Sequence, residues 1–98
     1  MPAVALHGVS VCTGHGCWPS RGTTSGSPTT FVEGSPVHRQ SDGWATHCCI
    51  TNPILCHAGS LASGSSTYYA EGLQVGRIGD PVDCGSSVAT GASTTFAN

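Results

Sequence analysis

Two segments of the chain are near-copies of each other. Residues 25–42 read SGSPTTFVEGSPVHRQSD and residues 63–80 read SGSSTYYAEGLQVGRIGD, with identical Ser, Gly, Ser, Thr, Glu, Gly, Val, Arg and Asp positions. A truncated third copy, TGASTTFAN, occupies residues 90–98. Such repetition is typical of a structural unit that cannot bury its apolar face alone. We therefore expect a fold built from copies of one unit that pack against each other.

Each full copy has the pattern of a β-hairpin. Its first half is rich in Thr and aromatic residues, which favour strands, and a Glu-Gly pair follows, where Gly permits a tight turn. The expected strands are residues 29–33 and 35–40 in the first copy, and 67–71 and 73–78 in the second. No apolar period of 3.6 residues supports a helix longer than a turn or two. The sequence therefore predicts an all-β fold.

The third copy has an outgoing strand but no return strand of its own. Residues 4–8, VALHG, align with residues 75–79, VGRIG, so that Val matches Val, Gly matches Gly and Leu6 replaces Arg77. We expect the N-terminal strand to pair with the C-terminal strand and to close a ring of three hairpins, because closure removes exposed strand edges. The 98-residue chain is then one domain. Its repeats span about 25–42, 63–80 and 90–98, the last completed by residues 1–9.

The composition favours a metal-stabilised fold. A 98-residue chain with 38% apolar residues buries a small core, so a metal, disulfide or partner is expected to stabilise it. The N-terminal residues lack the basic region and the long apolar run of a secretory signal, so we expect synthesis in the cytoplasm, where thiols stay reduced. Six Cys and five His then indicate a metal before disulfides. A net charge of −2 gives no electrostatic basis for binding nucleic acid.

Most of the His and Cys residues lie in the segments that follow the return strands. His57 and Cys84 each lie seven residues before the Gly of the next copy, Gly64 and Gly91. His15 leads into the first copy in the same way, with a short insertion. Three repeats thus deliver an imidazole or a thiolate to one level near the pseudo-threefold axis. There the hairpins converge and leave no room for an apolar core.

A fourth donor, most simply His47 from the long second segment, completes a tetrahedral set. Four nitrogen and sulfur donors are typical of one closed, structural zinc site. The expected ligands are His15, His47, His57 and Cys84. The substitutes, if the register differs, are Cys12, Cys48, Cys49 and Cys56.

Other roles stay open for several of these residues. Cys12, Cys17 and one of the neighbouring pair Cys48 and Cys49 can be small buried apolar residues. The disulfide alternative is a Cys12–Cys17 or a Cys49–Cys56 bridge.

The repeated charged residues also have a structural interpretation. Asp42 and Asp80 are expected to bond nearby amides in turns. Arg39 and Arg77 are expected to connect adjacent hairpins by bonding carbonyl groups.

The return half of each copy resembles the PAAR-repeat family, whose repeats carry G-x-P-A-A-R-x-G-D after a GS-x-T-V-x-V-x-G strand. Residues 34–42 read GSPVHRQSD and residues 72–80 read GLQVGRIGD. The family's four name-giving positions are occupied in the first copy by Pro36, Val37, His38 and Arg39. The departures from the family pattern are His38 and Gly76 in place of Ala, and Ser41 in place of Gly.

The resemblance implies a small cone of hairpins that caps a trimeric β-helical spike, with one tip for each trimer and a zinc ion near the vertex. Such tips end the spikes of contractile phage tails and of type VI secretion systems, where they meet the target-cell outer membrane transiently and can carry cargo effectors. The implied zinc site agrees with His15, His47, His57 and Cys84 as ligands. Residues expected at the base or in packing are Val32, Tyr69, Val75 and Phe96.

An enzyme is the least favoured interpretation. The chain has no H-E-x-x-H, G-x-S-x-G or phosphate-loop motif. Its carboxylates are Glu33, Asp42, Glu71, Asp80 and Asp83, and the first four occupy repeated, structural positions. The expected role is thus a membrane-piercing structural tip. The alternatives are a small disulfide-stapled secreted binding protein and, less favoured, a zinc hydrolase.

Overall fold

The computed structural model describes residues 1–51 and 53–98. Over these residues, the strands form three two-stranded antiparallel sheets and no helix is present. The sheets pair β1 (Phe31–Val32) with β2 (Ser35–Pro36), β3 (Gly43–Cys49) with β4 (Leu55–Ser60), and β5 (Tyr69–Ala70) with β6 (Leu73–Gln74). The all-β prediction is confirmed. None of the described segments is a helix long and apolar enough to cross a membrane.

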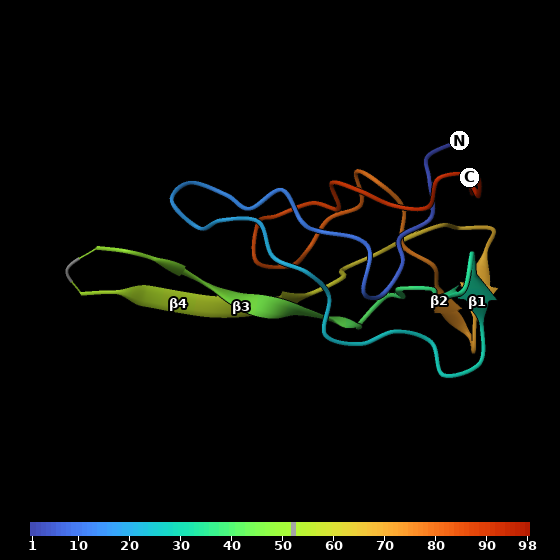
Figure 1. Cartoon of the computed structure of the whole chain (residues 1–98), viewed down its shortest axis with the longest axis horizontal. Helices are drawn as coiled ribbons and strands as arrows, with labels where there is room; N and C mark the ends of the chain where they lie inside the picture. The colour runs from blue at the N-terminus through green and yellow to red at the C-terminus, as the bar shows by residue number, and fades with distance from the viewer. Residues whose placement is uncertain (52) are drawn as a thin grey trace.

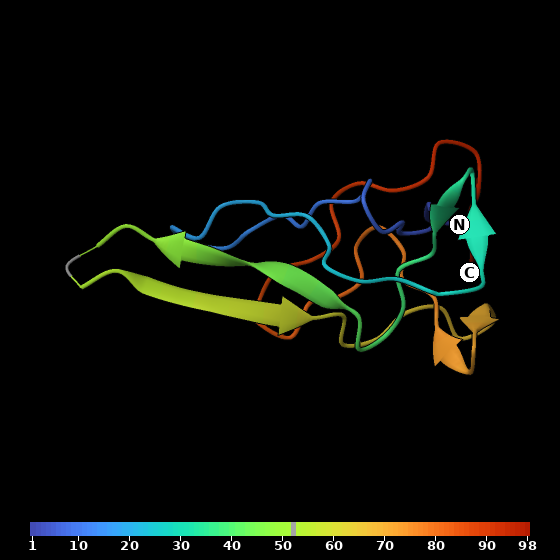
Figure 2. The same ribbon diagram turned by 60° about the horizontal axis from the view of Figure 1, so that its bottom comes forward.

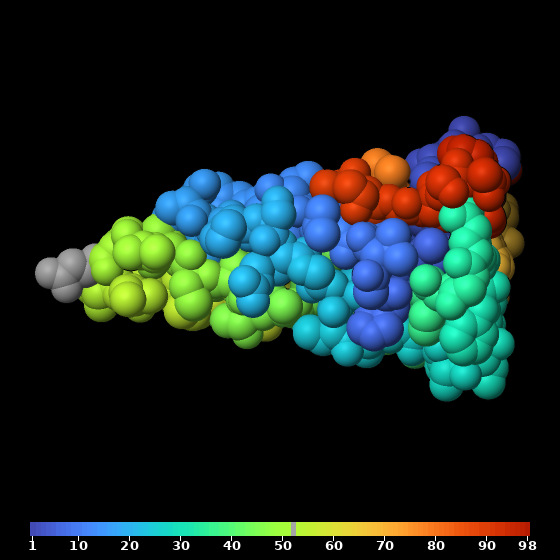
Figure 3. Space-filling model, viewed as in Figure 1, coloured from blue at the N-terminus to red at the C-terminus, as the bar shows by residue number. Residues whose placement is uncertain are grey.

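The molecule is a tapered cone, 42 Å long and 23 × 22 Å across. The hairpins β1–β2 and β5–β6 lie at the broad end, together with both termini (Figures 1 and 2). The β3–β4 hairpin runs from the middle of the molecule to the narrow end (Figure 2). The space-filling view shows the same taper (Figure 3). The predicted cone is therefore confirmed.

The two repeat hairpins form where the sequence predicts them, but their strands are shorter than expected. Both turns use a Glu-Gly pair in the left-handed region, with φ of 54° at Glu33, 80° at Gly34, 50° at Glu71 and 81° at Gly72. Each hairpin pairs only two residues of each strand. The rest of each return arm bonds to the neighbouring copies, which explains the short strands.

The return arms form a closed ring around the pseudo-threefold axis. The amide of Ala5 donates to the carbonyl of Gly76 (2.8 Å), that of Gly76 to His38 (2.8 Å), and that of His38 to Ala5 (2.9 Å). These three residues occupy equivalent positions in the predicted alignment of residues 4–8 with 75–79. The equivalent valines, Val4, Val37 and Val75, are each 0% exposed and belong to one apolar cluster.

The N-terminal strand also bonds to the last copy, as the sequence predicts. The amide of Val4 donates to the carbonyl of Thr95 at 3.0 Å, and Ala3 forms a bridge with Phe96. The same bond recurs in the full copies, from Val37 to Thr30 and from Val75 to Tyr68, each at 3.0 Å. The N-terminal strand therefore takes the place of the return strand that the third copy lacks, and the chain closes on itself there.

The glycines near the start of the second and third copies are required by a close backbone approach. The amide of Ser65 donates to the carbonyl of Val75 at 2.8 Å, and this contact brings Gly64 against the same carbonyl. A Cβ on Gly64 would lie 2.4 Å from the Val75 oxygen. The equivalent Gly91 would place its Cβ 2.6 Å from the Val4 oxygen. A side chain at Gly64 or Gly91 therefore pushes the first half of that copy away from its own return arm.

Replacing Gly64 with alanine is expected to destabilise the ring. The new Cβ overlaps rigid backbone, so we expect a loss of about 1–3 kcal/mol, as for other overpacked sites. Gly22→Ala is the matched control, because its Cβ meets only the Ser10 carbonyl oxygen at 4.0 Å. Urea unfolding of both variants measures the difference. Equal stability of the two variants would contradict the close-approach explanation.

Two glutamates connect neighbouring copies at the broad end. The Glu71 carboxylate accepts hydrogen bonds from the hydroxyls of Ser27 (2.6 Å), Thr29 and Thr30 (2.8 Å) of the first copy. The Glu33 carboxylate likewise accepts from the amide of Thr94 (2.9 Å) and from the amide and hydroxyl of Ser93 in the third copy. Hydrogen bonds to the charged form lower the pKa of each carboxyl from 4.5 to about 2.

These pKa shifts predict a pH-dependent contribution to stability. A carboxyl with a lowered folded-state pKa stabilises the fold above its unfolded pKa of 4.5, and this stabilisation is lost as the pH falls from 4.5 to about 2. The Glu33→Gln/Glu71→Gln variant is therefore expected to be less stable than wild type at pH 7, with the difference shrinking below pH 4.5. Urea midpoints across this range check it. A difference that does not change with pH would contradict it.

The repeated Arg and Asp residues form an ion pair within each turn. Asp42 accepts hydrogen bonds from the amide and Nε of Arg39, each at 2.9 Å. Asp80 accepts equivalent bonds from Arg77 at 2.8 and 3.0 Å. The prediction that these aspartates form turns is confirmed. The prediction that the arginines bond carbonyl groups is wrong: they bond the aspartates, and Arg39 also reaches Glu71 at 3.1 Å.

Candidate metal centre

The β3–β4 hairpin supplies two imidazoles from directly paired positions. His47 on β3 pairs with His57 on β4. Because paired residues of antiparallel strands project from the same face, both rings point to the same side of the hairpin. Residues 43–60 were expected only to carry metal donors, and their pairing as the longest hairpin was not predicted. This hairpin runs towards the narrow end of the cone (Figure 2).

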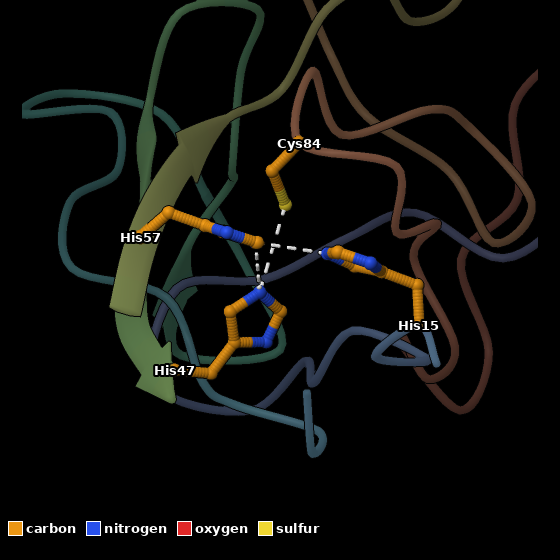
Figure 4. A group of neighbouring side chains, drawn as sticks. All are labelled: His15, His47, His57 and Cys84. Carbon is orange, nitrogen blue, oxygen red and sulfur yellow. Dashed lines mark hydrogen bonds between the residues drawn. The ribbon is translucent and has the colours of Figure 1, made fainter. Parts of the chain in front are cut away.

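The other two donors come from separate loops. His15 begins a tight turn in which its amide donates to the carbonyl of Trp18 (3.0 Å) and the Trp18 amide donates back to the His15 carbonyl (2.8 Å). Cys84 lies in the segment after the second repeat, and its thiol approaches Nε2 of His47 at 3.8 Å. Three segments far apart in the sequence therefore meet at one point. Figure 4 shows the three rings and the thiol directed at one another.

The four predicted ligands form one cluster. The Nε2 atom of His57 lies 2.9 Å from Nε2 of His15 and 2.7 Å from Nε2 of His47. The ligand atoms of His15, His47, His57 and Cys84 all lie within 4.8 Å of one another. Zinc–nitrogen bonds of about 2.0–2.1 Å and zinc–sulfur bonds of about 2.3 Å fit a group of this size. The described residues thus place a group that can hold a metal ion where the sequence predicts one.

The hydrogen bonding of His47 prepares its Nε2 atom to bind a cation. Its Nδ1 lies 2.8 Å from the carbonyl oxygen of Pro19, which can only accept, so Nδ1 carries the proton and Nε2 presents a lone pair. A neutral His57 can donate one Nε2 proton, yet this atom faces both His47 and His15. Desolvation, followed by the adjacent His47 and His15, lowers the pKa of His57 and favours its neutral form. A cation between the rings can bind the Nε2 lone pairs of all three neutral imidazoles, which one shared proton cannot satisfy.

Trp18 covers one side of the cluster, a role that was not predicted from the sequence. Its ring centroid lies 4.9 Å from that of His15 and 4.9 Å from that of His57. Its Nε1 donates to the carbonyl of Leu55 at 3.1 Å, which fixes the indole against β4. The available signal was a bulky aromatic residue three positions after a predicted ligand. Such a ring shields imidazoles from water.

The substitute ligands lie outside the cluster. Cys48 is bonded to Cys56, and Cys49 is bonded to Cys17. Cys12 is a free, buried thiol. The expectation of reduced thiols is therefore wrong for four of the six cysteines, and the alternative Cys12–Cys17 and Cys49–Cys56 pairings are also wrong. The reason is the undetected hairpin, whose register sets Cys48 opposite Cys56.

The donor set is consistent with a structural ion. Three imidazoles and one thiol are enough donors to complete a tetrahedral site, whereas a catalytic zinc keeps an open position for water. No carboxylate belongs to the group of donors that the described residues bring together. The arrangement can therefore cross-link three segments of the chain through one ion.

Comparison with known proteins agrees with this geometry. The PAAR motif family model matches residues 13–90 of the 98-residue chain. The matched span includes both full repeats and all four residues of the cluster. No curated protein sequence matches the chain.

Proposed function

Because this chain belongs to the PAAR motif family, whose members have a structural role at the spike tips of contractile injection systems, we propose that it caps and sharpens a trimeric β-helical spike. The role is non-catalytic. Residues 1–98 act as a single PAAR-like domain, with repeats at about 25–42, 63–80 and 90–98 completed by 1–9. The proposal covers phage tail spikes and type VI secretion spikes, because both end in a trimer. The observation that carries it is a three-fold set of aromatic residues at the broad end.

These aromatic residues occupy the same position in the three copies. Phe31, Tyr69 and Phe96 are 57%, 50% and 48% exposed, although large aromatic side chains are usually covered. Phe31 lies in β1 and Tyr69 in β5, the hairpins at the broad end (Figure 2). Three equivalent apolar side chains match the end of a three-fold spike, with one tip for each trimer. Of the other residues expected at the base, Val75 is buried and Val32 packs against the core.

The narrow end supports contact with a target membrane. Ile50, Ile54 and Leu55 are 88%, 61% and 51% exposed beside the β3–β4 connection. The sequence between Gly43 and Ala70 contains no Asp, Glu, Lys or Arg. Moving aliphatic groups from water into lipid is favourable, whereas moving charges into lipid is costly. An uncharged, aliphatic point is thus suited to enter the outer membrane of a target cell.

We assign zinc to the candidate centre, with His15, His47, His57 and Cys84 as its ligands. Imidazole and thiolate donors in a closed set favour this ion. When bound, the ion links the β3–β4 hairpin to the loops that hold His15 and Cys84. Its binding free energy then adds to the free energy of folding, at the end of the molecule where the cone is too thin for a large core.

The capping role is tested by mixing the purified chain with a trimeric β-helical spike fragment from the same organism. Sedimentation is expected to show one chain bound to three spike chains. Elemental analysis of the free chain is expected to give one zinc per chain. Failure to bind the spike would overturn the capping role. Failure to contain zinc would overturn the metal assignment alone, so the two results are distinguishable.

A further inference from the structure

Two disulfides lie beside the candidate centre, and they connect different parts of the chain. Cys48 and Cys56 are directly paired residues of β3 and β4, eight positions apart in the sequence. Cys49 on β3 is bonded to Cys17, which lies 32 positions away in the loop that carries His15. The first bond joins strands that are already paired. The second joins two separate segments of the chain.

The Cys17–Cys49 bond joins the two segments that supply His15 and His47. Cys17 lies inside the tight turn between His15 and Trp18, two residues from the His15 imidazole. Cys49 lies two residues from His47 along β3, so the two side chains project from the same face of the strand. The bond thus fixes the separation between the segment that supplies His15 and the strand that supplies His47.

Backbone bonds from Ala45 to Gly22 and from Thr24 to Gly43 join the end of the His15 loop to the start of β3, whereas nearer Cys17 the loop is held by side-chain contacts. The Trp18 indole donates to the carbonyl of Leu55, and Pro19 accepts from His47. By comparison, β3 and β4 are held by a backbone ladder with paired residues on both sides of Cys48 and Cys56. Closing a loop of 32 residues also restricts the unfolded chain more than closing one of eight. Loss of Cys17–Cys49 is therefore expected to loosen the position of His15 more than loss of Cys48–Cys56 does.

We propose that the Cys17–Cys49 disulfide positions His15 for metal binding, so that the affinity of the tip for its ion depends on the oxidation state of this bond. The inference rests on the metal site of the proposed function. Cys48–Cys56 links two strands that are already paired, so its loss is not expected to change the affinity for the ion. Cys17 is exposed, so a reductant can reach its sulfur. A dithiol reduces the bond with two electrons and two protons, which leaves thiols at Cys17 and Cys49 while the dithiol becomes a disulfide.

The test compares Cys17→Ser/Cys49→Ser with Cys48→Ser/Cys56→Ser. Each variant loses one disulfide and keeps the four ligands of the cluster. Zinc affinity is measured by competition with a fluorescent zinc indicator. The first variant is expected to bind zinc about 10–100-fold more weakly, as is typical when a group that supports a metal ligand is lost. The second is expected to match wild type. Equal affinities for the two variants would overturn the proposal.

A double-mutant cycle separates positioning of His15 from general destabilisation. In a His15→Ala background, removing Cys17–Cys49 is expected to cause no further loss of zinc affinity, because the group it positions is gone. A further loss as large as in wild type would contradict positioning.

If the first double variant does not fold, Cys48→Ser/Cys56→Ser, which retains Cys17–Cys49, is treated with a phosphine. The phosphine takes oxygen from water and becomes its oxide, and both sulfurs become thiols. Zinc is expected to dissociate faster after this treatment, as measured by transfer to the indicator. An unchanged rate would overturn the proposal. Spike binding by the untreated wild type reports separately on the capping role.

Discussion

Replacing His57 with alanine is expected to release the metal and to lower Tm by at least about 15 °C. The His57 Nε2 atom lies within 2.9 Å of both other imidazoles, so its removal opens the centre of the cluster. Structural zinc ions contribute about 10–16 kcal/mol of apparent binding free energy, and each kcal/mol lost lowers Tm by about 4–8 °C in a domain of this size. Calorimetry together with elemental analysis of the purified variant measures both effects.

The control for this variant is His7→Ala. His7 bonds the Thr23 hydroxyl at 2.7 Å and lies outside the metal cluster. We expect this variant to keep its metal and to melt within a few degrees of wild type. The ligand assignment would be wrong if the two variants melted alike and both kept one metal ion.

Replacing Tyr69 with aspartate is expected to abolish capping of the spike while leaving the metal and the fold intact. Tyr69 is 50% exposed on β5, so the fold tolerates a polar side chain there. In the complex, however, the carboxylate would be buried against an apolar surface without a partner. Loss of a central aromatic contact costs about 2–4 kcal/mol, so we expect affinity for the spike trimer to fall at least about 30-fold.

The matched control is Val9→Asp. Val9 is 49% exposed, nearly as much as Tyr69, but it does not belong to the aromatic set at the broad end. Sedimentation with the trimeric spike fragment is expected to show normal binding of this control. If both aspartate variants bound the spike as wild type does, the broad end would not be the docking surface.

The ring could be predicted from the sequence because its copies repeat the same residues. Matching Val4 with Val75 set the register of the N-terminal strand, and a hydrogen bond repeated around the axis needs that register in every copy. The grouping of His15, His57 and Cys84 followed from the same logic, since equivalent positions of a closed ring lie at the same level. A repeated unit thus carries long-range information that a single copy lacks.

The β3–β4 hairpin and the disulfides could not be predicted in this way. Residues 43–49, GWATHCC, show no clean alternation of apolar and polar residues, and the segment belongs to no repeat. Without that register, nothing places Cys48 opposite Cys56 or Cys49 near Cys17. The number of possible pairings among six cysteines is too large for spacing to decide. Trp18 was missed for the same reason, because its partner Leu55 lies on the undetected strand.

The most direct measurement is anomalous X-ray diffraction from crystals of the purified chain, collected on both sides of the zinc absorption edge. One peak is expected per chain, bonded to Nε2 of His15, His47 and His57 and to Sγ of Cys84. Crystals that show no such peak, or a peak bonded to other side chains, would contradict a tip whose three converging segments are joined by one ion.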